Sequence, residues 1–260
     1  MTSLPFFQVD AFAAEAPLTG NPAAVMPLDR WLDDALMQAI AAENNLSETA
    51  FTVPSERPDA DFDLRWFTPT TEVDLCGHAS LAAGHILVTG QTVRFATRSG
   101  ILTVTRKDDL LELDVPAFAT RPGDLPGLAD ALGVSGSAFL HDGGSASAIV
   151  LLDDEAAVRA VRPDFAKLRA FDRLVVVTAP GNDQDIASRV FAAYHGIDED
   201  PVTGAAHAAL VPLWAQRLGR DSFTALQASK RTGLLNCRLQ DDRVVLGGRC
   251  RTVIVGQFQP

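Results

Sequence analysis

The 260-residue sequence lacks several features that would indicate a membrane or a secreted protein. It has no run of about 18 apolar residues, the length that a membrane-spanning helix requires. Residues 1–8 contain neither a basic segment nor a long apolar segment, so we expect no secretory leader. The three cysteines are an odd number without metal-ligand spacing, and no disulfide framework is indicated. These absences favour a cytoplasmic protein.

Motifs for cofactors and signs of a polyanionic partner are absent as well. There is no Gly-x-Gly-x-x-Gly turn after a strand, no Walker loop and no clustered set of histidine and cysteine ligands. The sequence therefore predicts no bound metal, flavin, nicotinamide or pyridoxal phosphate. The formal net charge of −11 argues against nucleic acid or an anionic membrane as the main partner. A small anionic metabolite stays compatible, because one helix terminus can attract it locally.

What is present is a globular composition, with 47% hydrophobic and 21% charged residues. One stretch stands out, in which the polar residues 72–76 give way at Gly77 to small and apolar residues that end before Gly90. This pattern predicts a helix that begins at Gly77 and has a glycine just beyond its end. Because the helix is apolar nearly all round, we expect it to be buried. Its first-turn amides are then suited to binding an anionic group.

The same arrangement occurs a second time, where the acidic residues 199–200 lead through Gly204 into an apolar run that ends near Gly219. Two further matches keep this order. Arg65-Trp66-Phe67 corresponds to Arg189-Val190-Phe191, and residues 98–109 correspond to residues 231–242. We interpret the three matches as one internal duplication, which predicts two similar halves with helices beginning at about Gly77 and Gly204.

Each half contains several strands and one fully apolar helix, which needs cover on every side. A strongly bent sheet supplies that cover. The sequence therefore predicts an α+β fold of two pseudo-symmetric halves, each a barrel-like, mostly antiparallel sheet wrapped around a central helix. Residues 116–126 are the best linker, and we place the halves at residues 1–118 and 119–260, with a last strand able to cross back. A cleft between the halves is the expected site for a small molecule.

Four motifs, spread over most of the chain and in the family's order, resemble the phenazine biosynthesis PhzF-like family. They are Gly-Asn-Pro-Ala-Ala-Val at residues 20–25, Leu-Ser-Glu-Thr-Ala-Phe at 46–51, Asp-Leu-Cys-Gly-His-Ala at 74–79 and Asp-Pro-Val-Thr-Gly-Ala-Ala-His at 200–207. The resemblance implies a diaminopimelate-epimerase-like fold and an isomerase that uses neither metal nor organic cofactor. A homodimer is an open expectation. The family's founding activity isomerises a small hydroxylated, amino-substituted cyclohexadiene carboxylate.

The resemblance also assigns residues. Its general acid/base falls on Glu48, and its substrate contacts fall on His78 and Asp200. The backbone at the two helix starts completes the expected binding site, at Gly77, Gly204 and Ala205. The family often has serine where this chain has Ala205, so only the backbone amide can donate a hydrogen bond there.

Glu48 makes chemical sense from its sequence neighbours too. A carboxyl group among Leu46, Ala50 and Phe51 is partly desolvated, which suits it to proton transfer near neutral pH. The alternative from sequence alone is a solvated strand residue that points outward. The second half offers no acid at the equivalent place near Leu174, so we expect the catalytic groups on one side only.

Other roles stay open. His78 either contacts the substrate or caps its helix, and Asp200 either contacts the substrate or caps the second helix. Cys76 and Thr203 occupy equivalent positions in the duplication. Threonine is far too weak an acid to replace a thiol, so a mirror-image two-thiol mechanism is not expected, and Cys76 is interpreted as a small buried residue. His207 is expected to pack against a neighbour.

Three functions are compatible with these residues. The leading hypothesis is an isomerase in which Glu48 moves a proton on a small carboxylate-bearing metabolite. The second is a racemase or epimerase that uses Glu48 and Cys76 as unlike bases. The third is a protein that binds a small molecule without catalysis. A further expectation concerns Pro212, which should kink the second apolar helix or make it irregular.

Overall fold

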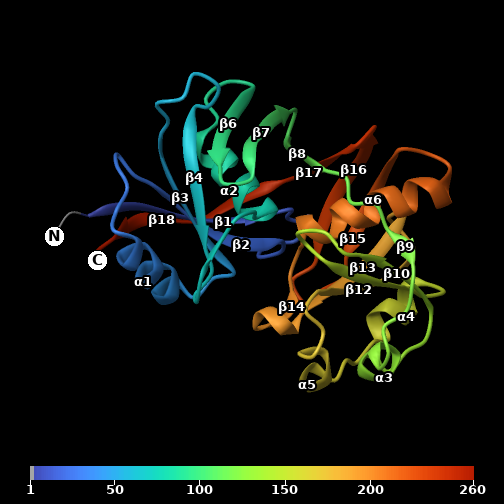
Figure 1. Ribbon diagram of the computed structural model, residues 1–260. Coiled ribbons are helices and arrows are strands. Elements are labelled where there is room, and N and C mark those ends of the chain that lie inside the picture. Colours follow the sequence, from blue (N-terminus) through green and yellow to red (C-terminus); the bar gives the residue numbers. More distant parts are fainter. Residues whose placement is uncertain (1–2) are drawn as a thin grey trace. The chain divides into compact units, whose positions relative to one another are not determined.

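The computed structural model describes residues 3–260, which divide into two compact units (Figure 1). Unit 1 comprises Met1–Asp114 and Gly247–Pro260, and unit 2 comprises Val115–Leu246. The last strand of the chain thus belongs to the unit that contains the first. Within the described residues, no helix is both long enough and apolar enough to cross a membrane.

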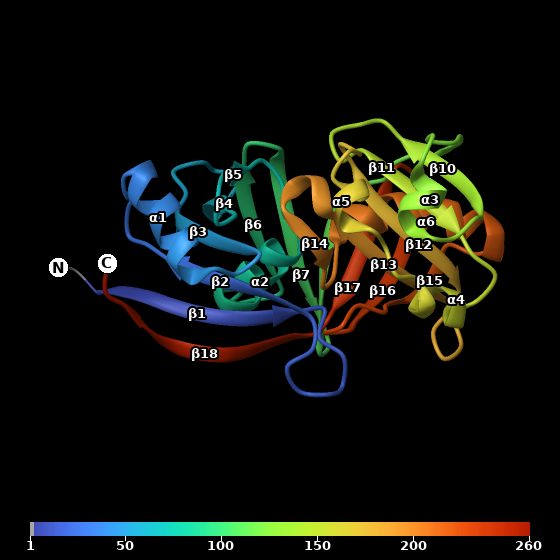
Figure 2. The ribbon, with the colours of Figure 1, turned by 90° about the horizontal axis from the view of Figure 1, so that it is seen from below.

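Unit 1 is a mixed, mostly antiparallel sheet with two helices. Its strands are β1 (Leu4–Ala11), β2 (Asn21–Pro27), β3 (Glu48–Pro54), β4 (Phe62–Phe67), β5 (Glu72–Val73), β6 (Thr92–Thr97), β7 (Gly100–Lys107), β8 (Leu110–Pro116) and β18 (Cys250–Phe258), and its helices are α1 (Asp34–Asn44) and α2 (Gly77–Leu87). Strand β1 pairs antiparallel with β18 and with β2 (Figure 2), and β2 pairs parallel with β3. Strand β4 joins β3 to β6, antiparallel and parallel respectively, and β6, β7 and β8 form an antiparallel meander.

Helix α2 is the element that the sheet of unit 1 surrounds. It contacts β1, β2, β3, β7 and β18, and every residue from His78 to Gly84 is buried. One close approach depends on glycine, because a Cβ atom added to Gly84 would lie 2.5 Å from Cγ1 of Val104 in β7. The expectation of a buried helix beginning at Gly77 is confirmed.

Unit 2 has a second sheet with its own central helix. Its strands are β9 (Arg121–Pro122), β10 (Ser137–His141), β11 (Ser147–Leu151), β12 (Leu174–Pro180), β13 (Ile186–Ala192), β14 (Ile197–Asp200), β15 (Ser222–Gln227), β16 (Gly233–Gln240) and β17 (Arg243–Gly248), and its helices are α3 (Leu128–Leu132), α4 (Glu155–Ala160), α5 (Phe165–Leu168) and α6 (Gly204–Leu218), with the 3₁₀ turn η1 (Ala193–His195). Helix α6 contacts β11 and β16, and its residues from Ala206 to Val211 are all buried.

The two units repeat one order of strand pairing. In unit 2, β11 pairs parallel with β12, β12 antiparallel with β13, β13 parallel with β15, and β15 antiparallel with β16. This is the sequence of pairings from β2 to β7 in unit 1. The matched hairpin turns even share backbone geometry, since Asp108 and Asp241 have φ angles of 55° and 53°. The predicted pseudo-symmetric α+β fold is therefore confirmed.

An ion pair is repeated as well, on the strand that leads toward each central helix. Arg65 of β4 donates from Nε to Oε1 of Glu72 at 2.7 Å, and Arg189 of β13 donates in the same way to Glu199 at 2.7 Å. Each guanidinium lies over the phenylalanine two residues further on, at 5.2 Å from the Phe67 ring and 5.1 Å from the Phe191 ring. The duplication thus preserves a structural contact that the sequence match alone did not reveal.

The two central helices end in different ways. Helix α6 ends as predicted at Gly219, in the left-handed conformation, but α2 ends at Leu87 with Val88 as an extended C-cap, so the predicted glycine end of α2 is wrong. Helix α6 also continues through Pro212. A proline removes the hydrogen bond to the carbonyl four residues earlier. That carbonyl, of Ala208, instead accepts the backbone N–H of Phe118 at 2.9 Å.

Candidate active site

Glu48 is the first residue of β3, at the point where the chain leaves α1. Helix α1 is capped at its C-terminal end by Asn45, whose left-handed backbone at φ 48° turns the chain toward the sheet. Glu48 then pairs with Ala23 of β2, and the following residues of β3, Thr49 to Val53, are buried. The Glu48 side chain is 14% exposed. It is therefore largely buried rather than directed into solvent.

The imidazole of His78, in the first turn of α2, lies directly beside this carboxylate. Its Nε2 atom is 3.1 Å from Oε2 of Glu48, and the His78 side chain is only 6% exposed. Neither of these two atoms has a hydrogen bond to any other group within residues 3–260. The carboxylate and the imidazole thus form a buried pair whose polar atoms depend on each other.

The second ring nitrogen of His78 faces other residues. Nδ1 lies 3.3 Å from Nδ2 of Asn21 and 3.5 Å from Sγ of Cys76. Asn21 is the first residue of β2 and is completely buried, and its Oδ1 atom accepts the hydroxyl of Ser47 at 3.3 Å. Strands β2 and β3 and helix α2 therefore each supply part of one continuous polar cluster.

Burial and charge act differently on the titratable groups of this cluster. Burial raises the pKa of the Cys76 thiol to about 11, with a further rise from the Glu48 carboxylate. Cys76 is therefore a neutral thiol at pH 7. Burial lowers the pKa of His78, but the neighbouring Cys76 and the Glu48 carboxylate outweigh it, so that this pKa lies well above its ordinary value. The carboxylate is the partner that stabilises a charged imidazole here.

These residues also contain atoms that metal ions bind. One ligand-type atom each from Glu48, Cys76 and His78 lies within 4.8 Å of the others. However, the two ring nitrogens of His78 face different partners, Nε2 toward Glu48 and Nδ1 toward Cys76. One imidazole cannot direct both nitrogens to one ion, so the observed geometry suits a chain of proton donors and acceptors better than a coordination site. That the protein binds no metal or cofactor stays a prediction.

The equivalent region of unit 2 contains different groups. Asp200 ends β14 and is buried, and its Oδ2 atom accepts a hydrogen bond from the Thr203 hydroxyl. Gln227, the last residue of β15, accepts the Thr203 backbone N–H at 2.9 Å and donates to the Asp200 carbonyl at 2.7 Å. The start of α6, at Gly204 and Ala205, is held against this strand end.

His207 lies one turn further along α6 and is completely buried. Its Nδ1 atom donates to the Thr203 carbonyl at 2.8 Å, since a carbonyl can only accept. Burial lowers the pKa of His207 to about 4. His207 is thus a neutral, buried histidine, in agreement with the expectation that it packs against its neighbours.

The site residues predicted from sequence therefore fall into two groups. In unit 1, Glu48 and His78 are in direct contact at the start of α2, which begins at Gly77. In unit 2, Asp200 lies beside the start of α6 at Gly204, with Ala205 in its first turn. The expectation of one-sided chemistry is consistent with the sheet register, because Leu174 begins β12 where Glu48 begins β3.

Three polar residues of these clusters had no predicted role: Asn21, Ser47 and Gln227. Asn21 and Ser47 lie within the quoted motifs, where a polar residue directly before Pro22 or Glu48 is a usable signal. Gln227 lies in no motif. Only the pairing of β15 with β13 brings it to the start of α6, and that pairing cannot be seen in a linear pattern.

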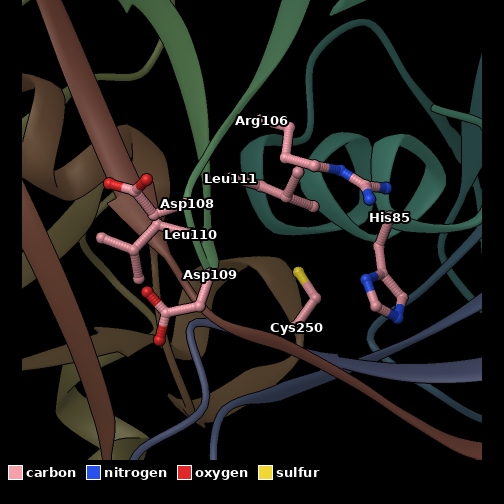
Figure 3. Close-up of a pocket in the computed structure, with 7 residues that line it drawn as sticks. All are labelled: His85, Arg106, Asp108, Asp109, Leu110, Leu111 and Cys250. Carbon is pink, nitrogen blue, oxygen red and sulfur yellow. The ribbon is translucent and has the colours of Figure 1, made fainter. Parts of the chain in front are cut away.

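A separate depression of about 180 Å³ lies in unit 1 at the other end of α2 (Figure 3). It is lined by His85, Arg106, Asp108, Asp109, Leu110, Leu111 and Cys250. His85 is in the last turn of α2, whereas His78 is in the first. The depression contains none of the predicted site residues, and its rim carries both charges, so it specifies no ligand class.

Comparison with known proteins identifies relatives over nearly the whole chain. A family model described as phenazine biosynthesis-like protein, PhzC-PhzF, matches residues 9–256. A Pseudomonas aeruginosa protein named as an uncharacterized isomerase is 48% identical, over 97% of this chain and 98% of its own. The crystal structure of a PhzF-family phenazine biosynthesis protein from Enterococcus faecalis is 42% identical, covers 100% of both chains and has a TM-score of 0.92.

The fold extends to more distant proteins. A probable proline racemase from Agrobacterium radiobacter K84 is 15% identical, covers 98% of this chain and 93% of its own, and has a TM-score of 0.66. At this identity the comparison concerns the fold alone. It agrees with the two similar units that the strand pairings show.

Proposed function

Because the chain belongs to the phenazine biosynthesis-like PhzC-PhzF family of isomerases, we propose that it moves a proton on a small carboxylate-bearing metabolite. Glu48 is the general acid/base of this reaction. His78, Asp200 and the backbone at Gly77, Gly204 and Ala205 position the substrate. The cytoplasmic location, the homodimer and the opening of both helix starts onto one cleft stay predictions.

The observation that supports this proposal most strongly is the pair formed by Glu48 and His78. Its facing atoms are 3.1 Å apart and have no other partner within residues 3–260. A carboxylate has two oxygens, and His78 occupies one of them. The second oxygen is then the atom that takes a proton from a substrate carbon and returns it at another position. A base held rigidly by one partner loses little entropy when it reacts.

The start of α2 is suited to binding an anionic group of the substrate. The first amides of a helix have no acceptor within the helix, and the helix dipole adds positive potential there. A substrate carboxylate bound at Gly77 and His78 gains from both effects. Charge that develops on an enolate-like oxygen during proton transfer gains in the same way. We therefore assign the helix start to binding and Glu48 to the chemistry.

A racemase with Glu48 and Cys76 as two bases is the alternative. Cys76 is near enough to His78 to belong to the same cluster. Its thiol, however, is buried and has a pKa raised to about 11, so little thiolate is present at neutral pH. The thiol is better suited to donating a hydrogen bond to His78 than to removing a proton from carbon.

The decisive experiment measures the exchange of carbon-bound hydrogen in the substrate for deuterium from the solvent. Small carboxylates, beginning with any ligand that mass spectrometry finds in the purified protein, are incubated with the enzyme in heavy water, and deuterium incorporation is measured by NMR. Glu48→Gln keeps the shape of the side chain but cannot exchange a proton near pH 7. Since general acid–base catalysis typically contributes about 10²–10⁴-fold, we expect at least a 100-fold loss of exchange with little change in affinity.

Two sets of variants make this test specific. Glu43→Gln alters an exposed glutamate in α1 and should leave the exchange rate unchanged. His78→Asn and Asp200→Asn should weaken binding and turnover together, because these residues position the substrate. The proposal fails if Glu48→Gln exchanges hydrogen at the normal rate. A protein that binds carboxylates without any exchange in its unmodified form would be a binding protein.

A further inference from the structure

The imidazole of His78 has a second polar side, which faces away from Glu48. There Nδ1 is contacted by the amide nitrogen of Asn21 at 3.3 Å and by the sulfur of Cys76 at 3.5 Å. All three side chains are buried, Asn21 completely. Buried polar groups of this kind must satisfy one another, because water does not reach them.

The donors and acceptors define which nitrogen of His78 carries a proton. An amide NH₂ group can only donate, so Nδ1 must accept the hydrogen bond from Asn21. The hydroxyl of Ser47 donates to Oδ1 of Asn21 at 3.3 Å, which keeps the amide oxygen away from the ring. A neutral imidazole whose Nδ1 accepts carries its proton on Nε2, the atom that faces Glu48.

We infer that Asn21 is a positioning residue, which acts through His78 by keeping the imidazole proton on Nε2, between the ring and the Glu48 carboxylate. Ser47 supports it by orienting the amide. The opposite tautomer would place a bare Nε2 lone pair against the carboxylate, and the two would repel. The role of Asn21 in turnover rests on the proposed function, whereas its effect on the tautomer does not.

The hydrogen bond from the Asn21 amide to Nδ1 also disfavours a positively charged His78. A second proton would have to bind at Nδ1, where Asn21 presents another donor rather than an acceptor. Glu48 favours the charged ring from the Nε2 side, and Asn21 disfavours it from the Nδ1 side. Cys76 is the other titratable group at Nδ1, and as a neutral thiol it too can donate. The contact with Asn21 therefore works against the charging of the ring that Glu48 favours.

The test reads the ring directly, without substrate. In protein labelled with ¹⁵N-histidine, the signals of His78 among the five histidines are assigned from the spectrum of His78→Asn. We expect a bare Nδ1 and a protonated Nε2 in the neutral state. Asn21→Ala should abolish this preference and raise the pKa of His78, because the opposing donor is gone. If Asn21 instead presented its oxygen to a protonated Nδ1, its removal would lower that pKa.

Further variants keep the inference falsifiable if Asn21→Ala folds poorly. Ser47→Ala leaves the amide in place but removes the hydroxyl that orients it, so we expect a smaller change in the same direction. Asn44→Ala alters an asparagine that bonds to Thr49, and it should leave the His78 signals unchanged. The inference is overturned if Asn21→Ala, or Ser47→Ala when the former does not fold, leaves the tautomer unchanged or lowers the pKa.

Activity then separates this inference from the proposed function. With a substrate in hand, Asn21→Ala should lower kcat about tenfold with little change in KM, and the limb of the pH–rate profile that reports His78 should move upward. A changed tautomer together with a fully active Glu48→Gln would refute the proposed function and leave the role of Asn21 at the ring standing. An unchanged tautomer together with an inactive Glu48→Gln would do the reverse.

Discussion

Units 1 and 2 have the same order of strand pairing and different chemistry at the start of their central helices. At the start of α2 a carboxylate, an imidazole and a thiol are within reach of one another. At the start of α6 an aspartate is held by a threonine hydroxyl, and a glutamine ties both to the neighbouring strand. In unit 1 the carboxylate faces an imidazole, whereas in unit 2 the carboxylate faces a hydroxyl group and an amide side chain lies beside both.

Some contacts occur in both units, whereas the catalytic candidates occur in only one. Both units keep the arginine–glutamate pair and its aromatic partner, as Arg65 with Glu72 and Arg189 with Glu199. These pairs hold the strand that leads to each helix. The residues at positions 48 and 174, which begin β3 and β12, lie outside these ion pairs and are a glutamate and a leucine. The ion pairs are therefore a property of the fold, and the acid is a property of one unit.

The largest expected effect concerns the histidines of the two helices, which should respond to pH in opposite directions. The pKa of His207 falls to about 4 in the folded protein, so between pH 4 and its ordinary value of about 6.5 the unfolded chain binds more protons. Stability is therefore lost as the pH falls through this range. At about 1.4 kcal/mol per pKa unit, the loss is on the order of 3 kcal/mol.

His78 gives the opposite sign. Its folded pKa lies well above the ordinary value, so its contribution to stability is present below pH 6.5 and is lost as the pH rises through the folded pKa. Urea unfolding between pH 4 and 9 tests both statements. His207→Gln should flatten the acid side of the stability curve, and His78→Gln the alkaline side. If both variants flatten the same side of the stability curve, the two histidines do not respond to pH in opposite directions.

The two arginine–glutamate pairs should contribute differently to the free energy of unfolding. Replacing Arg189 by methionine leaves Glu199 half-buried without a cation, because Arg189 is its ion-pair partner within residues 3–260. Glu72 keeps Arg98 at 2.7 Å when Arg65 is replaced. Hydrogen bonds to charged groups typically contribute about 1.5–3 kcal/mol, so we expect a loss of about 2 kcal/mol for Arg189→Met and about 1 kcal/mol for Arg65→Met. Urea unfolding measures both, and the reverse order would contradict the argument.

The smallest effect is expected at Cys76, the position that corresponds to Thr203. Cys76→Ser keeps a small donor beside Nδ1 of His78 and removes only the thiol. Hydrogen exchange on a confirmed substrate should fall less than tenfold, which is less than about 1.4 kcal/mol of transition-state stabilisation. Thr203→Ser serves as the matched change in unit 2. An inactive Cys76→Ser beside an active Glu48→Gln would show that the base is the cysteine.

Sequence patterns predicted where the central helices begin better than they predicted how the helices end and what they contact. The glycine-to-apolar transitions located the starts of α2 and α6, because an apolar run of this length is typical of a buried helix rather than of a strand. The same reading failed at the end of α2, where Val88 rather than a glycine is the cap. Helix α6 continues through Pro212, and only the structure shows that Phe118 donates to the carbonyl that the proline frees. A kink at Pro212 stays a prediction.

The sequence by itself indicated the duplicated α+β fold, because an internal repeat and turn residues are properties of the linear chain. The candidates Glu48, His78 and Asp200 came from the resemblance of its motifs to the PhzF-like family. Only the tertiary structure decided that His78 contacts Glu48 through Nε2 and Asn21 through Nδ1. These residues lie on β2, β3 and α2, far apart in sequence. Their distances depend on the parallel pairing of β2 with β3 and on the packing of α2 against both strands, which arise only when the whole unit folds.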